Sequence, residues 1–346
     1  MTLDRRSLLG SALTLSAMTL FPQMTRAQAR KLVFATFTGS WEEAHRDVLV
    51  PAFRKAGNEV LLDPMLSVDQ IAKVTAARNN PPIDVMLHDP GPALTAIAQD
   101  LVEPFPVAQS KHYGDLIAEA QDPSGPAMFF QVVGLTYNPE KIKTPPTSWA
   151  DLWKPEYKGR VGITNMNSTL GTGFMVELAR MYGGNESNIE PAFKKIAELK
   201  PSLAAVAANP GALAALYQQG QIDISPGNFN AIQILKARGV PVEFVAPKEG
   251  AIAFKTSVHI VKNSPNKALA ALLIDTALSP EVQTRLMQSP YLVVPTHGKV
   301  KMEGEIAKVL ARDQAEMKKK FVFQDWKKIN EQRPAWIDRF NREIKL

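Results

Sequence analysis

Residues able to hold a small polar molecule gather in three loops, each between an apolar run and a helix-like segment. The loops span residues 38–41, 88–92 and 167–173. The first backbone N–H groups of a helix have no intrahelical partner, so these loops can donate to anions and polar groups. Asn228, whose side-chain amide follows the strand-like run 222–224, is a further candidate. The candidate contacts are Thr38, Ser40, Trp41, Asp89, Ser168, Thr169 and Asn228.

These side chains have structural roles available as well as binding roles. Trp41 would stack on a ligand or pack against its own domain. Asp89 would pair with an ammonium group or form an Asx turn before a Pro-Gly pair. Ser40 and Glu43 have the spacing of a helix capping box. The hydroxyl of Ser168 would cap a helix and face a ligand at once.

The sequence carries no arrangement that points to catalysis. It has no cysteine, and the spacings typical of zinc proteases, serine hydrolases and P-loops are missing. His88 and Asp89 form the best local acid–base pair, but neighbouring loop residues rarely act together. We therefore expect no catalytic residue, no metal site and no cofactor. An exported hydrolase or lyase that uses His88 and Asp89 is the alternative.

Apolar runs alternate with helix-like segments along the chain, which predicts an α/β fold with mostly parallel strands. Two such units follow one another, each expected to form a sheet flanked by helices, with extended runs at 128–137 and 251–261. Ligands of open α/β sheets collect at the carboxyl ends of strands, where the three loops lie. The expected strands are 31–37, 59–62, 84–87, 160–163 and 222–224, and the expected helices are 40–55, 68–78, 93–99, 171–182, 191–199 and 211–219.

The first 29 residues have the composition of an export signal. Arg5 and Arg6 precede an apolar run too short to span a bilayer, and cleavage is expected after Ala29. The paired arginines resemble a twin-arginine signal, and an ordinary secretory signal stays open. The whole chain has 40 basic and 34 acidic residues. Three basic residues and one acidic residue lie in the signal, so the mature chain has a net charge of +4. So mild a charge predicts no nucleic-acid partner.

Five motifs carry a family resemblance. They are residues 134–138, 148–153, 154–160, 249–250 and 263–266. With these motifs the chain resembles periplasmic solute-binding proteins of ABC importers, in the group that binds polyamines, ferric iron, thiamine and phosphonates. The resemblance covers the whole mature chain.

The resemblance implies a bilobed periplasmic-binding-protein fold, type II-like, with a hinge between two mostly parallel sheets. We expect residues 30–133 and 255–346 in lobe 1 and residues 134–254 in lobe 2. The hinge crossovers would lie near 134–138 and 246–258. Such a protein is a periplasmic monomer that closes on a small solute and then docks on an inner-membrane ABC permease.

The resemblance also bears on the solute. Polyamine-binding members tend to carry a Trp and an Asp in the crossover, and the matching positions here are Phe254 and Thr256, with Lys255 between them. Thr256 joins the candidate contacts but supplies no negative charge, while Lys255 would add a positive charge to the polar lining of the site. We therefore expect a small anion or zwitterion, such as a carboxylate, a phosphonate or an amino-acid-like compound. A polyamine in an atypical pocket is the alternative, and coupling to a chemoreceptor stays open.

Overall fold

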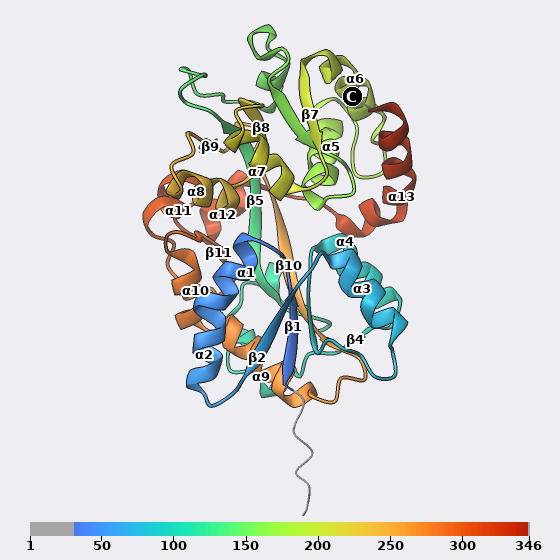
Figure 1. The fold of residues 1–346 in the computed structure, drawn as a ribbon, viewed down its shortest axis with the longest axis vertical. Coiled ribbons are helices and arrows are strands. Elements are labelled where there is room, and N and C mark those ends of the chain that lie inside the picture. The colour runs from blue at the N-terminus through green and yellow to red at the C-terminus, as the bar shows by residue number, and fades with distance from the viewer. Residues whose placement is uncertain (1–30, 345–346) are drawn as a thin grey trace, which may run out of the picture. The chain divides into compact units, whose positions relative to one another are not determined.

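Strands β1, β2 and β3 form a first parallel group in the computed structural model, which describes residues 31–344. β1 (Leu32–Thr36) pairs in parallel with both β2 (Val60–Pro64) and β3 (Val85–His88). Helices lie on both sides of this group (Figure 1). They are α1 (Ser40–Ala44) and α2 (Val50–Lys55) on one side, and α3 (Ser67–Ala76) and α4 (Pro90–Ala98) on the other.

Strands β6, β7 and β8 form a second parallel group. β6 (Val161–Thr164) pairs in parallel with both β7 (Leu203–Ala207) and β8 (Ile224–Asn228). The helices of this part are α5 (Thr169–Met181), α6 (Glu190–Leu199), α7 (Pro210–Gln218) and α8 (Phe229–Ala237).

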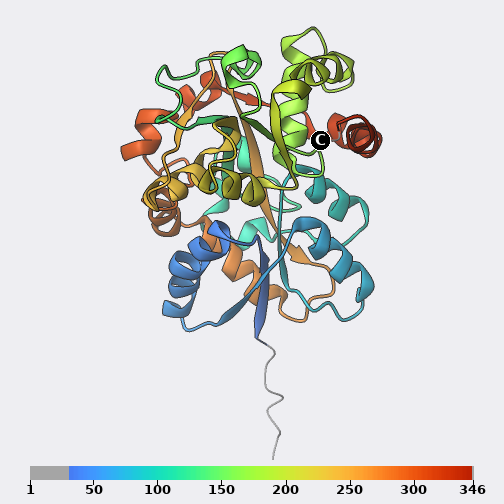
Figure 2. The same cartoon turned by 45° about the horizontal axis from the view of Figure 1, so that its top comes forward.

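Two long strands join the parallel groups. β5 (Ala127–Tyr137) and β10 (Ala251–Val261) pair antiparallel with each other, β5 also with β8 and β10 also with β3. Both run between the groups in the two views (Figures 1 and 2). The order β2-β1-β3-β10-β5-β8-β6-β7 is therefore one continuous sheet. The predicted α/β class is confirmed, and the two parallel groups are halves of this sheet.

Within residues 31–344 there are four further short strands and five further α-helices. The strands pair with β5 or β10 and are β4 (Val102–Glu103), β9 (Glu243–Val245), β11 (Val294–Pro295) and β12 (Phe321–Phe323). The helices are α9 (Lys267–Leu278), α10 (Pro280–Met287), α11 (Gly304–Val309), α12 (Gln314–Lys320) and α13 (Trp326–Glu343).

The last helix, α13, packs on α6. Phe340 of α13 shares a buried cluster with Phe193 of α6. Arg339 lies over the ring of Phe193 at 4.0 Å from its centroid and pairs with Glu190 at 2.6 Å. Residues 255–346, which include α13, are expected in lobe 1. The bounds of the two lobes stay a prediction.

The first helix begins differently from the expectation. Gly39 occupies its N-cap position at a φ of 73°, and no side chain caps it, so the capping box predicted for Ser40 and Glu43 is wrong. Glycine adopts a positive φ without steric strain, which lets the chain turn there and start the helix at Ser40. Glu43 instead accepts two hydrogen bonds from Arg238, the residue that follows α8, at 2.9 and 3.0 Å.

The Trp-rich segment before β6 belongs to the core. Ser148 and Asp151 form a capping box at the start of the 3₁₀ helix Trp149–Trp153. The indole of Trp149 is buried and donates to the carbonyl oxygen of Gly250 at 3.2 Å. The expected export signal lies outside the described residues. No helix within residues 31–344 is long and apolar enough to cross a bilayer.

Candidate ligand-binding site

Asp89 lies at the carboxyl end of β3, in the N-cap position of α4. Its carboxylate does not cap that helix. Gln131 Nε2 of β5 donates to Asp89 Oδ1 at 2.8 Å, and Thr256 Oγ1 of β10 lies 3.2 Å from the same oxygen and donates to it. The acidic group is therefore held by the two long strands rather than by its own helix.

Gln131 is the centre of this arrangement. Its Nε2 also donates to Thr256 Oγ1 at 2.8 Å, and its Oε1 accepts from Asn228 Nδ2 at 3.0 Å. All three of these neutral side chains are more than nine-tenths buried. With Thr169, described next, they form the Asp89 cluster, which comprises Asp89, Gln131, Thr169, Asn228 and Thr256.

Helix α5 adds a hydroxyl from the second parallel group. Thr169, its first residue, lies close enough to Asp89 for its hydroxyl to act against the rise in the pKa of that carboxyl. Ser168 is the N-cap, because its Oγ accepts from the N–H of Gly171 at 3.0 Å. Asp89 follows β3 and Thr169 follows β6. The Asp89 cluster thus joins loops from both halves of the sheet.

Trp41 lies beside the Asp89 cluster. Its indole stacks on Phe129 with ring centroids 4.1 Å apart and an interplanar angle of 5°. Phe129 is the register partner of Thr256, and directly paired residues place their side chains on the same face of a sheet. Thr38 is exposed and Ser40 is half-buried. Within the described residues, neither hydroxyl bonds to the Asp89 cluster.

Lys255 does not line this site, which corrects the expectation that it adds positive charge there. It pairs in register with Phe130, so its side chain leaves the sheet on the face opposite to Thr256. Its Nζ binds Asp122 Oδ2 at 2.9 Å. The positive charge of Lys255, which favoured an anionic solute, is therefore neutralised by Asp122 outside the Asp89 cluster.

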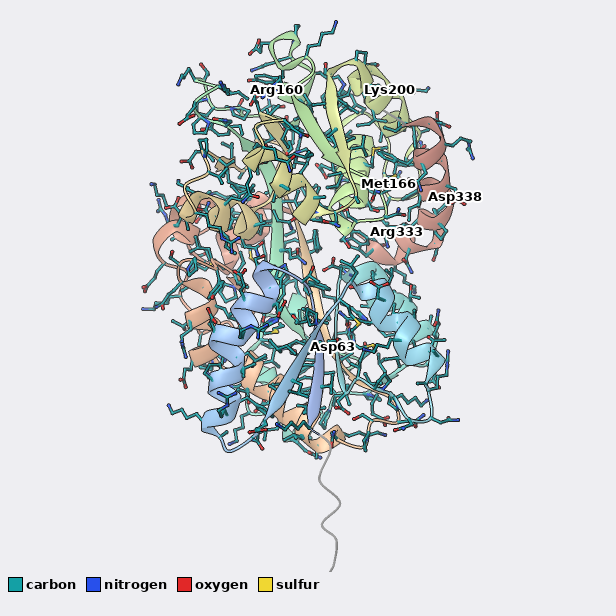
Figure 3. The ribbon with its side chains drawn as sticks, viewed as in Figure 1. Asp63, Arg160, Met166, Lys200, Arg333 and Asp338 are labelled. Carbon is teal, nitrogen blue, oxygen red and sulfur yellow. The ribbon has the colours of Figure 1, made fainter. Side chains whose placement is uncertain are left out.

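Arg333 and Gln131 are functional candidates that sequence reasoning missed. Arg333 Nη2 donates to the carbonyl oxygen of Asn167 at 2.7 Å, and also to that of Met166, beside which it lies in Figure 3. A Cβ at Gly91 would lie 3.0 Å from Arg333 Nη1, so the glycine leaves room for the guanidinium. A glutamine within an apolar strand was a usable signal for Gln131. Arg333 lies in α13, a highly charged helix, and no sequence pattern distinguishes it from the other charged residues there.

Two groups of the Asp89 cluster can accept hydrogen bonds from a ligand, the Asp89 carboxylate and Asn228 Oδ1. Burial raises the pKa of Asp89 to about 6, against the opposing effects of the Thr169 and Thr256 hydroxyls and the Arg333 charge. The carboxylate is therefore mostly ionised at neutral pH. Asn228 Oδ1 is buried without a hydrogen-bond partner among the described residues. A carboxylate and an orphan amide oxygen together match a ligand rich in N–H donors.

His88 is not arranged for acid–base work with Asp89. It is fully buried, and its ring centroid lies 5.6 Å from that of His259. Burial holds the pKa of His88 well below its usual range. Within residues 31–344, no three His, Asp or Glu side chains gather as a metal-binding group. The chemistry on offer at the Asp89 cluster is hydrogen bonding around one negative charge.

Residues 80–332 match the family of bacterial extracellular solute-binding proteins. A spermidine/putrescine-binding periplasmic protein of Escherichia coli is 34% identical over 151 residues, which cover 41% of each chain. A periplasmic protein of Salmonella typhi, for which 2-aminoethylphosphonate binding is proposed, is 25% identical over 227 residues, 64% of each chain. The chain thus matches less than two thirds of the length of either relative.

The fold itself has a close counterpart among solved structures. The periplasmic binding protein AfuA of Actinobacillus pleuropneumoniae aligns with a TM-score of 0.75 at 22% identity, over 92% of this chain and 99% of that one. The continuous sheet with two parallel halves is therefore the bilobed periplasmic-binding-protein fold. The family match over residues 80–332 shows that the chain belongs to the bacterial extracellular solute-binding proteins, and the solved structure shows the fold that it shares with a periplasmic binding protein.

Proposed function

We propose that the chain captures a small organic solute with a protonated amino group and delivers it to an ABC import permease. The observation that carries this proposal is the pair of acceptors in the Asp89 cluster: the Asp89 carboxylate, and Asn228 Oδ1, which has no partner within residues 31–344. An ammonium group would donate to both and balance the buried charge. Polyamines and zwitterions such as aminophosphonates or amino-acid-like compounds carry this group.

An anion without an amine fits less well. Asp89 is mostly ionised at neutral pH and would repel it. Lys255, the cation expected to receive it, is paired with Asp122. In a zwitterion, the amine would go to Asp89 while the acidic group turns toward the guanidinium of Arg333.

Solute binding would hold the two lobes together. Asp89 and Thr169, which meet in the Asp89 cluster, fall in lobe 1 and lobe 2 of the proposed division. A solute inserted between them would contact both lobes and favour the closed form that docks on the permease. We further propose a monomer that works in the periplasm, after cleavage following Ala29, without nucleic acid or cofactor.

An exported hydrolase or lyase on the same scaffold is the alternative from another class. It would need His88 and Asp89 to exchange protons with a substrate. The neutral, fully buried His88 packs against His259 instead. The contacts of the Asp89 cluster therefore favour binding over turnover.

Thermal melting of the mature protein with a panel of solutes tests the proposal. A solute that binds only the folded state raises the melting temperature as its concentration rises. We expect shifts with putrescine, spermidine or 2-aminoethylphosphonate, and none with citrate or inorganic phosphate. Mass spectrometry of solute released from natively purified protein identifies the physiological ligand. Shifts confined to the amine-free anions, or conversion of the released solute to a product, would refute the proposal.

A pair of matched variants locates the site. Asp89→Asn removes the charge but keeps the size of the side chain, and it should abolish the shift caused by the amine. Asp122→Asn makes the same change outside the Asp89 cluster, and it should leave that shift intact.

A further inference from the structure

We infer that α13 moves with the second parallel group of strands, and that Gly91 of α4 lets the molecule close by leaving room for α13. Gly91 lies two residues after Asp89 and acts as a positioning residue rather than as a contact of the solute. This role rests on the proposed function, since closure follows solute capture. It makes residue 91 a determinant of how long the solute stays bound.

Helix α13 is bonded to the second parallel group. Arg333 Nε donates to Thr172 Oγ1 of α5 at 3.1 Å, and its Nη2 donates to the carbonyl oxygen of Asn167 at 2.7 Å. Farther along the helix, Arg339 pairs with Glu190 of α6 at 2.6 Å. In Figure 1, α13 accordingly lies beside α6. When the two halves of the sheet move, α13 should therefore follow β6, β7 and β8, although it is expected in lobe 1.

The contact of α13 with α4 is of a different kind. A Cβ at Gly91 would lie 3.0 Å from Arg333 Nη1 and 3.2 Å from Asn330 Oδ1. Figure 1 shows the first turns of α13 just above α4, and Figure 3 shows Arg333 there. Within residues 31–344, the hydrogen bonds and ion pairs that α13 makes beyond its own ends go to residues 166–200, and none goes to α4. The two helices can therefore separate without breaking a bond between them.

The packing between α4 and α13 is also incomplete. Both helices line one cavity of about 370 Å³, which extends to β10. From α4 the cavity is lined by Ala93, Leu94 and Ile97, and from α13 by Trp326 and Lys327. Interiors of folded proteins are close-packed, with few voids larger than a water molecule. A cavity of this size is typical of two surfaces that come together and separate, rather than of two layers in one permanent core.

The neighbours of Gly91, rather than its backbone, call for a glycine. Gly91 has no positive φ, so its backbone would accept other residues. A carbon atom 3.0 Å from Arg333 Nη1 is closer than van der Waals contact, and α5 holds Arg333 in place. A larger side chain at residue 91 would therefore keep α13 away from α4. It would destabilise the closed form and leave the open form unchanged.

Distances between spin labels in the solute-free mature protein test the movement of α13. The chain has no cysteine, so the labels go to cysteines introduced by Ala335→Cys of α13, Ala98→Cys of α4 and Ala197→Cys of α6, all at exposed positions. The structure brings Thr169 of α5 close to Asp89, so an open cleft separates the halves further. We expect the distance from 335 to 197 to match the structure and the distance from 335 to 98 to exceed it.

The variant Gly91→Val tests the role of residue 91 in binding. Without solute it should melt no lower than the wild type. Putrescine should dissociate from it about tenfold faster, with an unchanged association rate, because the site forms but does not stay closed. Gly114→Val is the matched control, since no other part of residues 31–344 comes within 4 Å of a Cβ there, and it should change neither rate. In an Arg333→Ala background, Gly91→Val should change the dissociation rate less than about threefold, because the nearest neighbour is absent.

Four results would overturn the inference. In the solute-free protein, they are a distance from 335 to 98 that matches the structure and a distance from 335 to 197 that exceeds it. In the variants, they are an unchanged dissociation rate of putrescine in Gly91→Val and an equal effect of that substitution in the Arg333→Ala background. Failure of the proposed function looks different, since no amine of the panel would then bind the wild type. The spin-label distances would still decide how α13 moves.

Discussion

Replacing Asp89 by Asn should stabilise the ligand-free protein while it abolishes amine binding. Burial raises the pKa of Asp89 from 3.8 to about 6. A difference of about two pKa units corresponds to about 3 kcal/mol of folding free energy at a pH above both values. The amide oxygen of Asn can still accept from Gln131 and Thr256, which hold Asp89 Oδ1 at 2.8 and 3.2 Å.

The effect depends on pH, with a sign that follows from the raised pKa. The folded carboxyl group holds its proton more tightly than the unfolded one. Its contribution to stability is therefore fully present below about pH 4 and is lost as the pH rises through about 6. Asn has no proton to lose. The melting temperature of the variant should exceed that of the wild type by several degrees at about pH 7.5, and the gain should vanish near pH 4.

Differential scanning calorimetry of both proteins across this pH range measures the gain. Titration with the amine that gives the largest thermal shift measures the loss of binding. Asp122→Asn is the control, because that carboxylate is paired with Lys255 and its pKa is lowered. A variant less stable than the wild type at neutral pH, or a gain independent of pH, refutes the reasoning about burial. Unchanged amine affinity refutes the binding role of Asp89.

Four further outcomes are expected. The affinity for amines should fall about tenfold per pH unit below about pH 6, as the ionised fraction of Asp89 falls, and titration calorimetry at two pH values checks this. Ser168→Ala should destabilise the protein by about 1 kcal/mol in urea unfolding, and Ser168→Asp should restore most of it, since Asp also caps helices; equal losses in both variants would contradict the capping role. Trp41→Ala removes the stack on Phe129 and should lower the free energy of unfolding by about 3–5 kcal/mol, and a decrease below about 1 kcal/mol would show that the stack is not formed. Arg238→Ala should change stability by less than about 1 kcal/mol, because its pair with Glu43 is exposed, and a larger salt-sensitive change would contradict this.

Local patterns in the sequence predicted most of the helices and strands. The apolar runs that became β1, β3, β5 and β10 are buried, and their periodicity and flanking turns mark them without knowledge of the fold. β7, with its small alanine side chains, and α8, which follows β8 directly, gave no such signal. Their conformation depends on the strands and helices that pack against them.

The arrangement of the site could be predicted only in part. Asp89, Thr169, Asn228 and Thr256 were selected because they follow strands or match the family crossover, and the structure brings them together. Gln131 and Arg333 were missed, and Lys255 was placed on the wrong face. Adjacent side chains of a strand point to opposite faces, so an error of one residue in the alignment assigns a side chain such as that of Lys255 to the wrong face.

The residues alone were enough to indicate an α/β protein that resembles the solute-binding family, because composition, periodicity and contiguous motifs are properties of neighbouring residues. Which side chains meet depends on the folding of the whole chain. Gln131 and Thr256 are 125 residues apart in the chain, and Asp89 and Thr256 are 167 apart. Their hydrogen bonds depend on the register of β5 against β10 and on the docking of loops from both halves of the sheet. The same long-range packing buries Asn228 Oδ1, which has no hydrogen-bond partner among the described residues.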